Sequence, residues 1–259
     1  MKLLIQSDDY GITKRVADGI IDGIKQGVIR NTGLFVNMPW AQECVDKIRP
    51  YMDNIAFGQD LNVCAGNPCA DTKDIPSLLQ DNGSFLTSEM NRRLDKDAPN
   101  NDHVIYDEIL IEFKAQIDKF IGIVGKKPDY LHPHAYFSAT SHRAMSDCGK
   151  EYGIPVSFEV SKKYDFANPK DSWYKDVRPG IDQKSIDVTT FIVEDKMQLL
   201  NHDYASIICH AGYADDEELE KLTTFTQIRE KDLEAMVSAQ VKEWIESNGI
   251  ELITYKDLK

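Results

Sequence analysis

The stretch LIQSDDYGIT, from Leu4 to Thr13, shows how the chain begins to fold. A short apolar run ends on two adjacent carboxylates, Asp8 and Asp9, which an aromatic residue and Gly11 follow. This pattern predicts a buried strand over residues 2–7 with paired acids at its carboxyl end. In parallel α/β folds, ligands and catalytic groups collect at the carboxyl ends of the strands. Polar residues that end the other strands are therefore expected near Asp8 and Asp9.

Length, composition and charge narrow the class of protein. The chain has 259 residues, 42% of them hydrophobic and 28% charged, and its net charge is -13. The length fits a single α/β barrel domain, 1–259. An acidic chain argues against nucleic acid and membrane partners, because both require a basic face. The N-terminal apolar run is too short for a signal peptide, and the five cysteines form no CxxC pair, so we expect a reduced, cytoplasmic protein.

Short apolar runs alternate with amphipathic segments along the chain. This alternation predicts a mainly parallel sheet of about seven strands, a (β/α) barrel variant. The expected strands lie at 2–7, 28–39, 54–63, 126–134, 153–160, 204–210 and 249–255. Helices are expected after a cap at Thr13, over 109–124, over 140–153 and over 186–201, with a break or cap at Ser238 in the last helical region. Residues 64–101 lack this regularity and contain three prolines, which predicts an insertion or lid.

Four of the expected strands end on residues that bind metals or transfer protons. Besides the paired acids, these are Asp60, the two histidines His132 and His134, and His210. Successive strand residues point to opposite faces, so the adjacent acids favour a split role in which one coordinates a metal and the other accepts a proton. The two histidines are two residues apart and can share a face. Mixed carboxylate and imidazole ligands suit Zn²⁺, Mn²⁺ or Mg²⁺.

Each of these residues also has a purely structural explanation. The paired acids before Gly11 are typical of a turn, Asp60 can cap its strand, and His210 can be a buried core histidine. Cys209 is interpreted as a buried strand cysteine, because only His210 beside it is basic. The coincidence of polar groups at four strand ends favours an active site over four separate structural roles.

Taken in order, the motifs resemble those of the YdjC-like family, the chito-oligosaccharide deacetylases. The resemblance covers essentially the whole chain, and the matching segments are QSDDYGIT, NTGLFVNMP, GQDLNVCAG, KKPDYLHPHAYFS, CHAGY and GIELITY. It implies a (β/α) barrel variant that holds a divalent metal. By matching position, it implies that Asp8 is the general base, Asp9 and His134 are metal ligands, and His210 is the general acid.

Three positions depart from the family pattern. Asp60 stands where the family has a histidine ligand, His132 where it has an aspartate, and Ser157, followed by Phe158, where it has an arginine. A carboxylate at position 60 makes the site harder and more anionic. We therefore expect one divalent ion on Asp9, Asp60 and His134, with Mg²⁺ first and Mn²⁺ or Zn²⁺ as alternatives. The rival arrangement has His132 coordinating beside His134 while Asp60 only caps its strand.

The expected function is metal-dependent removal of acetyl from an N-acetylated sugar or oligosaccharide. Two alternatives remain open: a divergent sugar-binding protein, and a metal-dependent barrel hydrolase that acts on a phosphorylated disaccharide or another bond. The expected partner is a small sugar, and the sequence is also compatible with a homo-oligomer. Acetate release from an N-acetylglucosamine oligomer distinguishes the first function from the other two.

Overall fold

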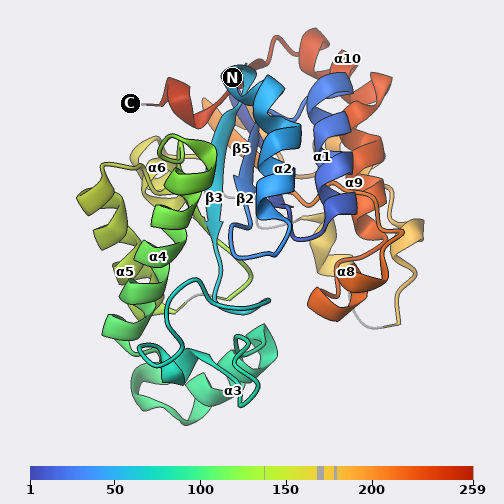
Figure 1. Cartoon of the computed structure of the whole chain (residues 1–259). Coiled ribbons are helices and arrows are strands. Elements are labelled where there is room, and N and C mark those ends of the chain that lie inside the picture. The colour runs from blue at the N-terminus through green and yellow to red at the C-terminus, as the bar shows by residue number, and fades with distance from the viewer. Residues whose placement is uncertain (137, 168–171, 178–179, 259) are drawn as a thin grey trace.

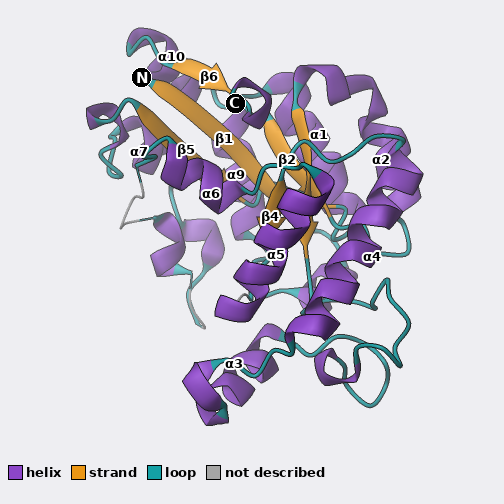
Figure 2. Cartoon of the chain, turned by 90° about the vertical axis from the view of Figure 1, so that its left-hand side faces the viewer, coloured by secondary structure: helices purple, strands orange, loops and turns teal. Residues whose placement is uncertain are grey.

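The computed structural model describes residues 1–136, 138–167, 172–177 and 180–258. One sheet of six parallel strands forms its centre, in the order β4-β3-β2-β1-β5 with β6 also paired to β1 (Figures 1 and 2). The strands are β1 (Lys2–Tyr10), β2 (Asn31–Leu34), β3 (Ala56–Leu61), β4 (Leu131–Pro133), β5 (Tyr204–Cys209) and β6 (Glu251–Ile253). The predicted parallel α/β sheet is thereby confirmed, with six strands rather than seven.

Helices connect the strands, because parallel neighbours require long crossovers. Figure 1 shows α1 and α2 beside the strands, with α9 behind α1 and with α4 and α5 at the opposite end of the sheet. The α-helices are α1 (Lys14–Gln26), α2 (Ala41–Ile48), α3 (Ser88–Asp97), α4 (Tyr106–Val124), α5 (Ala139–Tyr152), α6 (Ser157–Lys163), α7 (Val188–Val193), α8 (Glu217–Leu222), α9 (Ile228–Val237) and α10 (Ala239–Ser247). None of the described helices combines the length and apolar character needed to span a bilayer.

Local capping explains several of these boundaries. The Thr13 hydroxyl accepts a hydrogen bond from the Val16 amide and begins α1, as the sequence predicted. Ser238 ends α9 and its side chain caps the start of α10, so the predicted break is confirmed. The helix expected over 186–201 is shorter, because α7 covers only Val188–Val193.

The strand expected over 153–160 is wrong. The chain touches the sheet there through one bridge, between Leu131 and Val156, and then forms helix α6. A short apolar run such as GIPV does not distinguish a strand from the approach to a buried helix. The polar residues that follow favour the helix, since Lys162 and Lys163 lie in its last turn, where cations stabilise the helix dipole.

Residues 64–101 lie beyond the carboxyl ends of the strands. They contain α3 and two short 3₁₀ helices, η2 (Pro76–Leu78) and η3 (Pro99–Asn101). Figure 1 shows α3 below the sheet, on the side to which β3 points. Ile75, Leu78 and Phe85 pack in one buried cluster with residues of α4, so part of this segment has its own anchored core. Whether it acts as a lid stays a prediction.

Candidate active site

A local distortion of β1 brings the paired acids together. Asp9 has a φ of 68°, a left-handed conformation that Asp tolerates better than most residues. Between Ser7 and Tyr10, β1 contains one more residue than the facing stretch of β2, which is the pattern of a β-bulge. The bulge interrupts the regular alternation of side chains between the two faces of the strand. Asp8 and Asp9 therefore both line one cavity, although they are adjacent in sequence.

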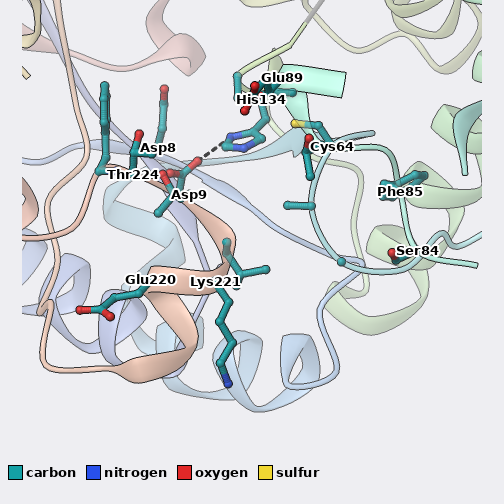
Figure 3. Close-up of a pocket in the computed structure, with 18 of the residues that line it drawn as sticks. Asp8, Asp9, Cys64, Ser84, Phe85, Glu89, His134, Glu220, Lys221 and Thr224 are labelled. Carbon is teal, nitrogen blue, oxygen red and sulfur yellow. Dashed lines mark hydrogen bonds and ion pairs between the residues drawn. The ribbon is translucent and has the colours of Figure 1, made fainter. Parts of the chain in front are cut away.

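The cavity has a volume of about 870 Å³ and opens at the carboxyl edge of the sheet. Asp8, Asp9, His134 and His210 line its floor. Figure 3 shows the first three of them together. One wall comes from residues 64–92 and includes Phe85, Glu89 and Arg92; the other comes from residues 220–225 and includes Glu220, Lys221 and Phe225. The two walls carry charges of both signs and an aromatic ring each.

Asp9 is held by two cations. Its Oδ1 lies 2.8 Å from His134 Nδ1, and its Oδ2 accepts a 2.6 Å hydrogen bond from Arg229 Nη2. Figure 3 shows the Asp9 carboxylate pointing at the His134 ring. Burial acts to raise the pKa of Asp9, but His134 and Arg229 together hold it well below its ordinary value. Burial acts to lower the pKa of His134, yet Asp9 raises it well above its ordinary value, so the two shifts agree.

Arg229 was not predicted from the sequence. It is fully buried, projects from α9, and also donates from Nε to the Phe225 carbonyl at 2.7 Å. The signal was present in TQIREKDLEAM, where a cation and an acid, Arg229 and Asp232, stand three residues apart on one helix face between apolar residues.

Asp8 belongs to a second carboxylate–imidazole pair. Its Oδ2 lies 3.3 Å from His132 Nε2, and His132 Nδ1 lies 2.8 Å from the Ser157 hydroxyl. Burial acts to raise the pKa of Asp8, but the charge and hydrogen bond of His132 lower it below its ordinary value. Both ring nitrogens of His132 therefore already have partners, and His132 is not among the cavity-lining residues.

Asp60 lies against the backbone of the bulge. Its Oδ2 accepts a 2.7 Å hydrogen bond from the Asp9 amide, while its Oδ1 is buried without a hydrogen-bond partner. Gly33 on β2 makes room for it, since a Cβ there would stand 1.8 Å from Asp60 Oδ1. Burial, and next the negative charge of Asp8, raise the pKa of Asp60 to about 8.

His210 follows β5 and faces the same cavity. Its backbone amide donates to Asp232 Oδ2 at 2.7 Å and to the Tyr174 hydroxyl at 2.9 Å. Its ring packs edge-on against Tyr174 and Phe225, and its Nδ1 is buried without a hydrogen-bond partner. Burial lowers the pKa of His210. The sequence predicted His210 but not its supports, which are Asp232 on α9 and Tyr174 on the 3₁₀ helix η4 (Trp173–Asp176).

Asp9, Asp60 and His134 supply donor atoms that a divalent ion could use. No three His, Cys, Asp or Glu side chains in the described ranges form a complete metal cluster. However, Asp9 Oδ1 and His134 Nδ1 stand 2.8 Å apart, close to the spacing of two ligands about 2.1 Å from one ion. Asp60 Oδ1 is buried without a hydrogen-bond partner, and the partner of Asp9 Oδ1 is His134 itself. Two carboxylates and one imidazole are a mainly oxygen donor set, which fits a hard ion that keeps several waters, such as Mg²⁺, better than Zn²⁺.

A parallel α/β sheet whose strand ends carry two buried carboxylate–imidazole pairs places groups suited to proton transfer at one edge of the sheet. Comparison with known proteins makes this specific. The family model described as YdjC-like protein matches residues 2–247, and the chain therefore belongs to the YdjC-like family. The resemblance found in the sequence is confirmed.

Related proteins cover the full length of the chain. "Carbohydrate deacetylase 2" of Listeria innocua is 30% identical over 262 residues, covering 100% of this chain and 99% of its own. "Carbohydrate deacetylase" of Clostridium beijerinckii is 28% identical over 267 residues, covering 100% of both chains. The expectation of a carbohydrate deacetylase is thus supported by the names of these relatives.

Solved structures support the fold. A candidate cellobiose-phosphate cleavage protein from Enterococcus faecalis superposes with a TM-score of 0.79 at 23% identity, covering 99% of this chain and 98% of its own. A peptidoglycan N-acetylglucosamine deacetylase superposes with a TM-score of 0.52 at 12% identity, covering 99% of this chain and 87% of its own. Both share the architecture of the sheet and its helices.

Proposed function

We propose that this protein removes acetyl from an N-acetylated sugar or oligosaccharide by hydrolysing the C–N bond of the acetamide. One observation carries the proposal: a base candidate with a lowered pKa, Asp8, and an acid candidate, His210, face the same cavity. The names of the YdjC-like relatives point to the same reaction.

Asp8 is suited to accept the proton of the attacking water, because the pKa shift caused by His132 keeps its carboxylate ionised at neutral pH. The water oxygen bonds to the acetyl carbon, and the C–N bond then breaks. The protonated imidazole of His210 gives its proton to the departing amine through Nε2, since Nδ1 is enclosed by the protein. Because burial lowers its pKa, His210 is mainly neutral at neutral pH and must take up a proton before it acts as the acid, and it then gives that proton up readily. The products are acetate and a free amino sugar.

We further propose that Asp9, His134 and Asp60 hold a divalent ion, Mg²⁺ first, with Mn²⁺ and Zn²⁺ as alternatives. When bound there, the ion would polarise the acetyl carbonyl. Arg229 keeps Asp9 oriented toward His134. Phe85 and Phe225 offer apolar ring faces to a sugar from opposite walls of the cavity. A cytoplasmic location also remains our proposal, because all five cysteines are free thiols.

The test is acetate release from N,N′-diacetylchitobiose and longer N-acetylglucosamine oligomers, with Mg²⁺, Mn²⁺ or Zn²⁺ added in turn. We expect stoichiometric acetate and free amine from the native protein and none from Asp8→Asn. Absence of acetate with every metal and every oligomer would overturn the proposal. Cleavage of a phosphorylated disaccharide under the same conditions would replace it with the alternative hydrolase.

A further inference from the structure

The Asp8 carboxylate is held on both oxygens by side chains that the proposed reaction does not use. Gln6 Nε2 donates to Oδ1 at 2.5 Å, and His132 Nε2 lies 3.3 Å from Oδ2. Gln6 is two residues from Asp8 on β1, so both side chains leave the same face of the strand. Gln6 is fully buried and is not among the residues that line the cavity.

Each of these two contacts continues to a further buried hydroxyl. Gln6 Oε1 accepts a 2.9 Å hydrogen bond from the Tyr255 hydroxyl, and His132 Nδ1 lies 2.8 Å from the Ser157 hydroxyl. The Ser157 hydroxyl acts against the rise in the pKa of Tyr255 that burial causes, as a hydroxyl that donates toward the Tyr255 oxygen does, so the two arms meet at this pair. We call this set the support ring: Gln6, Asp8, His132, Ser157 and Tyr255. Its members come from β1, β4, α6 and the 3₁₀ helix η7 (Tyr255–Asp257).

The contacts of the support ring can all be assigned donors and acceptors without conflict. Tyr255 gives its only hydroxyl proton to Gln6, so toward Ser157 its oxygen can only accept. Ser157 then accepts from His132 Nδ1–H, and His132 Nε2–H donates to Asp8. Both arms therefore end by donating to the Asp8 carboxylate. Every bond in the ring is made in this one direction, and reversing one leaves a buried group without a partner.

We propose that Gln6, His132, Ser157 and Tyr255 are positioning residues that fix the orientation of the Asp8 carboxylate toward the cavity. The two arms hold one oxygen each, so the carboxylate cannot rotate without breaking a buried hydrogen bond. Ser157 can affect Asp8 only through His132, because Ser157 is 3% exposed and does not line the cavity. This inference rests on the proposed role of Asp8 as the base.

The chain supplies a matched control for the tyrosine. Tyr130 stacks on Tyr255 with ring centroids 4.0 Å apart, but its hydroxyl is buried without a hydrogen-bond partner. Tyr255→Phe and Tyr130→Phe therefore remove the same atom from neighbouring rings, and only the first opens the support ring. Ser157→Thr keeps the hydroxyl that Ser157→Ala removes.

The experiment is steady-state kinetics of deacetylation together with ¹⁵N NMR of the His132 ring, assigned with His132→Gln. We expect Tyr255→Phe and Ser157→Ala each to lower kcat about fivefold, the loss of one ordinary hydrogen bond, with KM unchanged. The double variant should fall no more than about tenfold, because the ring is already open. Tyr130→Phe should keep full activity, and Ser157→Thr should recover most of it.

Equal losses in Tyr255→Phe and Tyr130→Phe, or multiplying losses in the double variant, would overturn the proposal. The NMR arm needs no activity, so it separates this inference from the proposed function. Ser157→Ala should shift the His132 Nδ1 signal, whereas Ser146→Ala, which loses only an exposed bond to Glu159, should not. An unmoved Nδ1 signal in Ser157→Ala would show that the ring is absent, whatever the protein hydrolyses.

Discussion

Asp60 and His132 are register partners across the β3–β4 pair. The resemblance to the YdjC-like motifs implies a histidine and an aspartate at these positions, which would mean that an acid and an imidazole have changed places between neighbouring strands. The exchange moves the imidazole next to Asp8, 3.3 Å from its Oδ2. The third departure, Ser157, binds the other nitrogen of the same imidazole. The three residues that depart from the motifs therefore lie together beside Asp8.

The exchange predicts that the two positions are energetically coupled. Asp60→His and His132→Asp each place two like groups next to each other on adjacent strands and should destabilise the fold. The double variant restores an acid–imidazole pair and should recover about 0.5–3 kcal/mol relative to the sum of the singles. Urea unfolding in the presence of EDTA measures this, so that bound metal makes no contribution. Strict additivity would show that the two positions are not coupled.

Arg229 should be the most costly side chain of the site to remove. It is fully buried and its partner Asp9 is 1% exposed, so Arg229→Gln leaves one oxygen of a buried carboxylate without its cation. We expect a loss of about 3–5 kcal/mol in the free energy of unfolding. The control is Arg15→Gln, which breaks an exposed pair with Asp215 and should cost less than about 1 kcal/mol. Similar losses in the two variants would contradict the buried pair.

Asp232 predicts a pH dependence of stability. Burial raises its pKa to about 6, against the lowering effects of its hydrogen bonds with Tyr174, His210 and Trp173 and of the charge of Arg229. The folded state then binds a proton more tightly than the unfolded chain, whose carboxyl keeps a pKa near 3.8. Stability should therefore fall as pH rises from about 4 to 6, by up to roughly 3 kcal/mol. Below that window this loss is absent.

The measurement compares urea unfolding of the native protein and Asp232→Asn at several pH values. The asparagine cannot ionise, so the stability of the native protein relative to the variant should decline across the window. A constant difference between pH 4 and 7 would show that the Asp232 carboxyl is not perturbed. Other groups titrate equally in both proteins and cancel in the comparison.

The residues on the floor of the cavity could be predicted from the sequence, because short apolar runs locate the strands and therefore the residues at which they end. Apolar runs located β1, β3, β4 and β5, and the parallel arrangement then brought their terminal polar residues together. The supports were not predicted, because they come from elements that no local pattern links to the site. Arg229 and Asp9, for example, are 220 positions apart. The support ring likewise depends on Tyr255, which the sequence presents only as the end of a strand.

The acid role of His210 predicts a dependence on the leaving group. His210→Ala should strongly lower the rate on an N-acetylated sugar, whose amine must be protonated to depart, and lower it less on an activated acetyl ester. The comparison is kcat/KM for N,N′-diacetylchitobiose and for 4-nitrophenyl acetate. An equal loss on both would assign His210 to substrate binding or structure.

Asp60 provides the final prediction, which concerns this chain rather than its family. We expect Asp60, Asp9 and His134 to bind one divalent ion, because Asp60 stands where the YdjC-like motifs place an imidazole ligand and its Oδ1 is buried without a partner. Two carboxylates and one imidazole neutralise a 2+ charge, which favours hard ions such as Mg²⁺.

Metal analysis of Asp60→Ala, His134→Ala and His132→Ala tests the assignment. The first two variants should lose the ion, whereas His132→Ala should retain it, because both His132 nitrogens already face Asp8 and Ser157. Full metal content in Asp60→Ala would remove Asp60 from the ligand set and leave Asp9 and His134 with water as the remaining ligands.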